Sequence, residues 1–204
     1  MARRARPYVR RDARGDGAAM PLMRASRLLL DTNVWVDYFH GVGPGVAAIE
    51  EIVSRGLKGK VHLLYAPTSA KDVFYLISRR LRQTDARGSS SSASFTAAAS
   101  ACVRRMMEVA DAAPQSYAEC ELACLLRSNF DDFEDNLIIA AAETDKADYV
   151  VTSDRLFLQA LPEACITPDR AVALLDIAKL GAGAPAQRRR SLMIRGFYYR
   201  STGL

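Results

Sequence analysis

Three short apolar segments, each followed by a helical pattern, constrain the fold of this chain more than any other feature. They are residues 28–30 (LLL), 61–67 (VHLLYAP) and 149–152 (YVVT). Each segment is apolar nearly throughout, instead of alternating between apolar and polar residues, which is typical of strands in a parallel sheet that is covered on both faces. We therefore expect an α/β fold in which helices connect the strands and cover the sheet.

The segments between these strands predict the connecting helices. Apolar residues at helical spacing, together with turn residues, predict helices that begin near Asn33 and at Asp135, and helices over 46–56, 68–81, 95–110, 117–127 and 168–179, with a last short strand around Ile166. Thr68 is expected to cap its helix, since its hydroxyl can accept a hydrogen bond from a free N–H group of the first turn. Residues 83–94 (QTDARGSSSSAS) are expected to form a mobile Ser-rich loop.

Charge is distributed unevenly along the chain. The net charge is +5; residues 1–27 carry eight Arg and two Asp, residues 188–204 carry five Arg and no acid, and the residues between them therefore carry −6. We expect a basic, disordered extension at 1–26, one domain at 27–180 and a basic tail at 181–204. The N-terminal extension is equally compatible with attraction to RNA, with a merely solvated tail, or with translation that starts at Met20 or Met23.

Nothing in the sequence suggests a membrane or a secreted protein. No apolar run approaches the roughly 18 residues that span a bilayer, and the first twenty residues lack the apolar core of a secretory signal. The four cysteines form no CxxC pair, in agreement with a reducing compartment. We expect a cytoplasmic protein without a membrane partner.

Four acidic residues follow the predicted strands. Asp31 comes directly after 28–30, and Asp154 comes two residues after 149–152. Because parallel strands end at the same edge of a sheet, and ligands bind there, both carboxylates should lie at one site. Asp135 opens an apolar helix, and Asp72 lies in the first turns of the helix after the second strand. Four ionised acids this close would repel one another, and Mg²⁺ or Mn²⁺ would neutralise them with oxygen ligands.

Each acid taken singly has a structural explanation. Asp31 can cap the helix near Asn33, and Asp135 can stabilise a helix N-terminus. Asp154 can be a turn residue, and Asp72 a solvated surface charge. Their joint position at strand ends favours the metal site.

Two of these segments resemble the motifs of the PIN domain family, a group of metal-dependent ribonucleases that includes VapC-type toxins. "LLLDTNVWVDYF" is similar to the family's first motif, with Asp31 as its acid and Asn33 as a supporting neighbour. "FEDNLIIAAAETDKADYVVTSDRLF" is similar to its second motif, with Asp135 and Asp154 as acids and Thr152 as a supporting hydroxyl. In "APTSAKDVFYLI", Asp72 stands where the family normally carries Glu, one methylene longer.

The resemblance implies a fold and an activity. It implies a three-layer α/β/α sandwich around a mainly parallel sheet of about four to five strands. It also implies a ribonuclease in which Asp31, Asp72, Asp135 and Asp154 are catalytic and hold Mg²⁺ or Mn²⁺, and in which Asn33 and Thr152 support them. RNA is the implied substrate, with a homodimer and a cognate antitoxin as implied partners, because the toxin of a VapBC-type pair is the favoured role.

Other functions remain open at this point. A housekeeping RNA-processing nuclease and a non-catalytic module that binds RNA or protein would both keep the fold. A haloacid-dehalogenase-type phosphatase is disfavoured, because it needs a second Asp two positions after the first, where this chain has Asn33. Trp35, Tyr38 and Phe39 could stack on bases, but a core or dimer contact is the favoured role for three aromatic residues on one helix.

Overall fold

A parallel sheet of five strands forms the centre of the molecule. The computed structural model describes residues 26–43, 45–85, 91–127 and 131–180, with side chains as far as 177. The strands lie in the order β3-β2-β1-β4-β5, and every neighbouring pair is parallel. The strands are β1 (Ser26–Leu30), β2 (Val61–Tyr65), β3 (Asp111–Ala112), β4 (Tyr149–Val151) and β5 (Cys165–Ile166).

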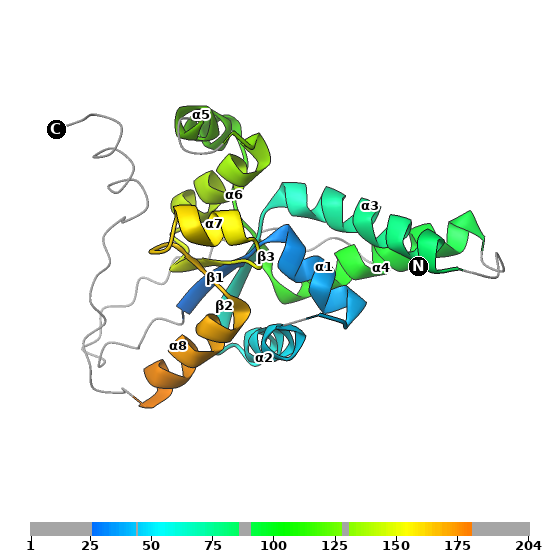
Figure 1. Ribbon diagram of the computed structural model, residues 1–204, viewed down its shortest axis with the longest axis horizontal. Coiled ribbons are helices and arrows are strands. Elements are labelled where there is room, and N and C mark those ends of the chain that lie inside the picture. Colours follow the sequence, from blue (N-terminus) through cyan, green and yellow to red (C-terminus); the bar gives the residue numbers. More distant parts are fainter. Residues whose placement is uncertain (1–25, 44, 86–90, 128–130, 181–204) are drawn as a thin grey trace, which may run out of the picture.

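Helices cover both faces of this sheet, because successive residues of each strand point to opposite sides. Leu28 and Leu30 of β1 belong to the core that packs under α1, α2, α3, α4 and α8, whereas Leu29 belongs to the core under α5, α6 and α7. Figure 1 shows these two helical layers on either side of the strands. The predicted three-layer α/β/α sandwich is therefore confirmed. The helices are α1 (Thr32–His40), α2 (Val46–Leu57), α3 (Pro67–Thr84), α4 (Ser92–Val109), α5 (Tyr117–Leu126), α6 (Phe133–Thr144), α7 (Arg155–Ala160) and α8 (Pro168–Leu180).

Several local boundaries differ from the prediction. The Ser-rich loop predicted at 83–94 is shorter, because α3 continues to Thr84 and α4 begins at Ser92, with the Ser91 side chain accepting a hydrogen bond from the Ser94 N–H group. Residues 86–90 of that loop lie outside the described residues. Thr68 is not the cap of α3: Ala66 holds the cap position and Pro67 opens the helix, because proline lacks the N–H group that would otherwise be unsatisfied there.

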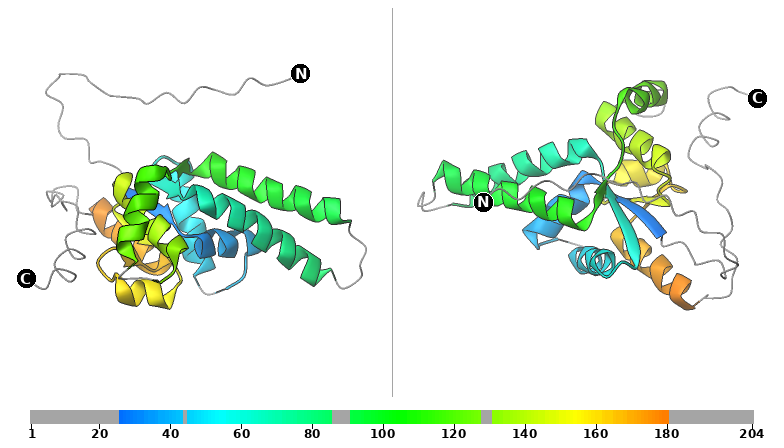
Figure 2. Two further views of the ribbon diagram at one scale, coloured as in Figure 1. Left: turned by 90° about the horizontal axis from the view of Figure 1, so that it is seen from above. Right: turned by 180° about the vertical axis from the view of Figure 1, so that it is seen from behind.

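Helices α3 and α4 form an antiparallel pair that projects away from the sheet. Figure 2 shows the two helices side by side in both views, with the sheet at one end of the pair. Their contact is apolar: Val73 and Ile77 of α3, and Ala99 and Met106 of α4, are all buried in the same core. The outer sides of both helices are left to solvent.

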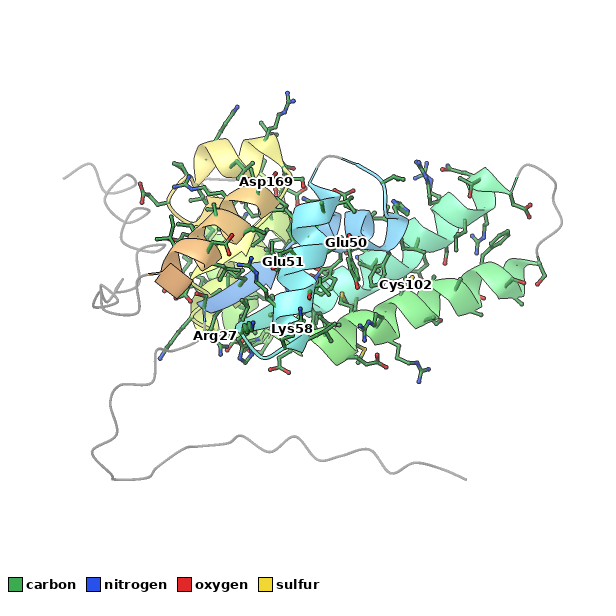
Figure 3. All side chains as sticks on the ribbon, turned by 90° about the horizontal axis from the view of Figure 1, so that it is seen from below. Arg27, Glu50, Glu51, Lys58, Cys102 and Asp169 are labelled. Atoms are coloured by element: carbon green, nitrogen blue, oxygen red, sulfur yellow. The ribbon has the colours of Figure 1, made fainter. Side chains whose placement is uncertain are left out.

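In the same helical layer, the buried side chain of Arg55 joins α2 to α8. Arg55 Nε donates to Glu51 Oε1 at 2.6 Å, and Arg55 Nη2 donates to Asp176 Oδ1 at 2.8 Å. Figure 3 shows Glu51 on α2 where that helix lies beside α8. The ion pairs thus tie the C-terminal helix to the domain.

The aromatic residues of α1 behave as core residues. Trp35 is fully buried, and Tyr38 and Phe39 are half-buried against the same core. Within the described residues, no helix is both long enough and apolar enough to span a bilayer. The basic segments predicted at 1–26 and 181–204 lie outside the described residues, except for Ser26, which begins β1.

Candidate active site at the carboxyl edge of the sheet

Asp31 is a buried carboxylate that three hydrogen-bond donors hold in place. It follows β1, caps α1, and is only 5% exposed. Its carboxylate accepts hydrogen bonds from the Thr32 N–H group at 2.6 Å, the Asn33 side-chain amide at 2.6 Å and the Thr152 hydroxyl at 2.7 Å. Burial raises the pKa of Asp31, and these three donors oppose the rise. Three hydrogen bonds therefore fix the position of the carboxylate, and its oxygen atoms can still accept a further contact.

Asn33 and Thr152 link the ends of β1 and β4. The Asn33 amide also donates to Thr152 Oγ1 at 3.0 Å, and its oxygen accepts from the Ser153 N–H group at 3.0 Å. Thr152 Oγ1 in turn accepts from the Asp154 N–H group at 3.0 Å. These bonds lie at the point where the strand order reverses between β1 and β4, which is where open α/β sheets bind ligands.

Asp154 and Asp135 border the Asp31 carboxylate from two helices. Asp154 caps α7 by accepting from the Leu156 N–H group at 2.7 Å. Asp135 is the third residue of α6, which begins two residues earlier than predicted because Asp132 caps it. The pKa of Asp135 is raised to about 6, first by burial and then by the charges of Asp132, Asp31 and Asp154. Three of the predicted site residues therefore share one electrostatic environment.

Asp72 belongs to a second, adjoining group. Its Oδ1 atom lies 3.1 Å from Lys71 Nζ, and its Oδ2 atom is buried with no N–H or hydroxyl donor among the described residues. The pKa of Glu134 is raised to about 7, first by burial and then by a hydrogen bond to Asp72 and by the charge of Asp72. The four predicted acids therefore fall into two neighbouring groups, one with Asp31, Asp135 and Asp154 and one with Asp72.

Glu134 is the site residue that the sequence reasoning missed. It directly precedes Asp135, and consecutive residues of a helix point about 100° apart. One carboxylate can therefore face Asp31 while the other faces Asp72. The sequence does carry a sign of this residue, because "FEDN" places two consecutive acids at the start of an apolar helix. Two acids at the start of a helix that packs into the core point to a polar site at that end of the helix.

The floor of the site is apolar and holds a thiol. Cys165 on β5 is buried, and its pKa is raised to about 12 by burial and by the charges of Asp31 and Asp135. The thiol therefore stays protonated at neutral pH and is no nucleophile. Its proximity to both carboxylates shows how close the site lies to the core.

A hydroxyl pair connects the two groups of acids. Thr32 of α1 donates to Ser69 of α3 at 2.8 Å, and Ser69 is fully buried. This bond fixes the first turn of α3, the helix that carries Asp72 one turn later, against the helix that follows Asp31. The spacing between the two acidic groups is thereby set by packed elements and not by a loop.

The donor set suits a hard divalent cation. All the donors are carboxylate and hydroxyl oxygens, and burial followed by the charges of neighbouring carboxylates raises the pKa values of Asp135 and Glu134. In the described part of the chain, no three His, Cys, Asp or Glu side chains converge closely enough to enclose an ion by themselves. Mg²⁺ keeps several waters and needs only one or two direct carboxylates, so the residues present fit a hydrated ion.

Comparison with known proteins supports the same fold. A family model described as "PIN domain" matches residues 27–156. Among solved structures, PAE2754 from Pyrobaculum aerophilum matches with a TM-score of 0.54 and 14% identity, covering 75% of this chain and 91% of that one. VapBC2 from Rickettsia felis, bound to a DNA fragment from its promoter, matches with a TM-score of 0.49 and 12% identity, covering 69% and 98%. No curated protein sequence matches significantly.

Proposed function

Because its family model spans well over half of its length, the chain belongs to the PIN domain family of nucleases, and from this premise we propose that it is a metal-dependent ribonuclease. Its reaction is the hydrolysis of RNA phosphodiester bonds. The observation that carries the proposal is the gathering of Asp31, Asp135 and Asp154 at one edge of the sheet, where burial and then the charges of Asp132, Asp31 and Asp154 raise the pKa of Asp135 to about 6. A protein retains such a costly cluster when function requires it.

The acidic residues are assigned to metal binding and to a neighbouring acidic pair. We propose that Asp31, Asp135 and Asp154 hold Mg²⁺ or Mn²⁺, and that Asp72 acts beside them together with Glu134. When bound, such an ion would activate a water molecule and neutralise charge on the attacked phosphate.

The supporting residues act on Asp31. Thr152 and Asn33 donate to the Asp31 carboxylate, and so favour its ionised form and fix its orientation. The buried thiol of Cys165 and the apolar floor exclude water from behind the carboxylates.

The finer proposal is a biological role. We propose that residues 27–180 form a catalytic domain that serves as the toxin of a VapBC-type pair in the cytoplasm, as a homodimer that a cognate antitoxin inhibits. The motif resemblance supports this role. Induction of the wild-type chain should arrest growth, whereas the Asp31→Asn variant should not; equal arrest by both chains would remove the toxin role and leave RNA processing.

Cleavage of a mixed RNA pool tests the proposed activity. Purified full-length protein is incubated with tRNA, rRNA and single-stranded RNA in Mg²⁺, in Mn²⁺ or in EDTA. We expect metal-dependent cutting by the wild type and at least about a hundredfold loss in Asp31→Asn and Asp135→Asn, because each removes a charge that stabilises the ion.

A matched control separates the site from general charge effects. Glu50→Gln removes one carboxylate from an exposed position of α2, a helix that contributes no residue to the site (Figure 3), and should cut like the wild type. Cutting that persists in EDTA, or in both Asp variants, would refute the metal mechanism. An absence of cutting by every form would favour a non-catalytic module that binds RNA or protein.

A further inference from the structure

We propose that one exposed face of α3 binds the backbone of single-stranded RNA and leads the strand to the carboxylate site. The face consists of Lys71, Tyr75, Arg79 and Arg82, and it is called the α3 stripe here. The inference rests on the proposed function for the identity of the substrate, but its evidence is independent of the acidic residues.

The four residues form a line along the helix. They are spaced four, four and three positions apart, which puts them within one narrow arc of a helix with 3.6 residues per turn. All four are exposed. At a rise of 1.5 Å per residue, the stripe extends for about 16 Å along α3. Val73 and Ile77, on the opposite side of the helix, are buried in the core.

The stripe begins at the candidate active site. The Lys71 ammonium lies 3.1 Å from Asp72 Oδ1. Lys71 is therefore beside the second acidic group, and Tyr75, the next residue of the stripe, follows it about one helical turn later. From there α3 runs outward as one helix of the projecting pair (Figure 2).

The outer cations of the stripe have no internal task. Within the described residues, neither Arg79 nor Arg82 forms an ion pair. Arginine that is not held by a carboxylate is free to bind phosphate through its planar set of donors. Burial, packing and ion pairing therefore do not account for these two side chains.

Tyr75 adds an aromatic surface between the cations. It is 64% exposed, and its ring is oriented by edge contact with Phe74 at a centroid distance of 5.3 Å. An exposed aromatic ring between basic residues is the arrangement on which single-stranded bases stack while cations follow the backbone. Duplex RNA keeps its bases paired and offers no such stacking.

Charge complementarity selects nucleic acid over a second copy of the chain. The residues of α3 comprise four cations and the single acid Asp72, whereas the neighbouring carboxylate site repels phosphate. A symmetric dimer through the stripe would bring like charges together, which is unfavourable. For a polyanion such as RNA, attraction to the cations of the stripe offsets repulsion by the nearby carboxylates.

Binding in EDTA tests the stripe without any cleavage. Full-length protein is titrated into a fluorescein-labelled single-stranded RNA of mixed sequence, and anisotropy is recorded over a range of salt concentrations. Each phosphate contact on a single strand contributes about 0.7 to the slope of log K against log salt. The double variant Arg79→Ala/Arg82→Ala should therefore make this negative slope shallower by about 1.4. Tyr75→Ala should weaken binding at least about fivefold with no change of slope.

Arg80→Ala is the matched control, because it removes the same charge from an exposed position of the same helix on a different side. It should leave the slope unchanged. An unchanged slope in Arg79→Ala/Arg82→Ala, or an equal decrease per arginine in Arg80→Ala, overturns the stripe, as does an equal effect of Tyr75→Ala on duplex RNA. Cleavage assays on the same variants distinguish the two proposals. If the protein cuts RNA but its binding does not depend on the stripe, only the stripe proposal is rejected. If its binding depends on the stripe but it does not cut RNA, only the nuclease proposal is rejected.

Discussion

At the scale of single residues, the site is defined by how the carboxylates are held. Asp31 is nearly inaccessible to water yet accepts three hydrogen bonds, which offset the cost of burying an ionised group. Among the described residues Asp135 has no comparable set of donors, and burial and the neighbouring charges raise its pKa. Two acids at the same sheet edge thus differ in how firmly their ionised forms are supported.

Asp135 makes the metal-free protein less stable at neutral pH. Its folded pKa of about 6 lies above the ordinary 3.8, so the folded state binds the proton more readily and loses stability as the pH rises from about 4 to about 6. Asp135→Asn should therefore melt a few degrees above the wild type at pH 7 in EDTA, and the difference should shrink toward pH 5. Thermal unfolding at both pH values, with the exposed Glu163→Gln as control, measures it; a difference that does not depend on pH contradicts it.

Thr152 should matter through Asp31. Thr152→Val keeps the volume of the side chain but removes the hydroxyl that donates to Asp31 and accepts from Asn33 and from the Asp154 N–H group. We expect a loss of about 1–3 kcal/mol of unfolding free energy, and a lower kcat with little change in KM. Thr96→Val, whose hydroxyl bonds only to its own helix, is the control. Wild-type kcat in Thr152→Val would show that Asp31 needs no such support.

At the scale of elements, the sheet edge is assembled by close packing of helices on strands. Gly56 near the end of α2 lies directly over Leu63 of β2, and this contact brings α2 down onto the sheet. Short segments are less predictable: β3 consists of Asp111 and Ala112, both exposed, and shows no apolar pattern that could have indicated a strand. The short helix α7 was likewise not predicted.

Gly56 should not tolerate a methyl group. A Cβ atom added at this position would lie 2.8 Å from Leu63 Cγ and closer still to its Cδ1, so Gly56→Ala should cost about 1–3 kcal/mol through overpacking, less the helix propensity that alanine adds. Urea unfolding of Gly56→Ala, Leu63→Ala and the double variant forms a cycle. The double variant should lose less stability than the two single losses together, and strict additivity would contradict the contact.

At the scale of the whole molecule, the proposed divalent ion should stabilise the fold, because it would relieve repulsion among the acids at one edge of the sheet. An ion that binds only the folded chain stabilises it by about 2.7 kcal/mol at a concentration one hundred times its Kd. The Tm of the wild type should then rise by about 5–10 °C in Mn²⁺. Asp31→Asn should respond much less. Calorimetry in Mn²⁺, against NaCl of equal ionic strength, measures the shift, and no shift for the wild type would speak against the metal site.

The sequence alone determined the parallel α/β architecture and the position of Asp31, Asp135 and Asp154 near strand or helix ends. Apolar runs and helical spacing are local patterns, and the edge rule for parallel sheets turns local positions into a shared neighbourhood. Cap positions were less certain, because Thr68 and Pro67 both suit the start of α3 and only packing, with the Thr68 N–H group bonded to Gln115, decides between them.

Only the tertiary structure decided which acids act on one another. Asp72 faces Glu134 and not Asp31, because the directions of side chains on α3 and α6 depend on how both helices cross the sheet. The same holds for the α3 stripe. Its spacing along one helix face follows from the sequence, but it begins beside the carboxylates because α3 packs against α1 in the core and through the Thr32–Ser69 bond. Local pattern determines what each element is, and long-range packing determines which side chains meet.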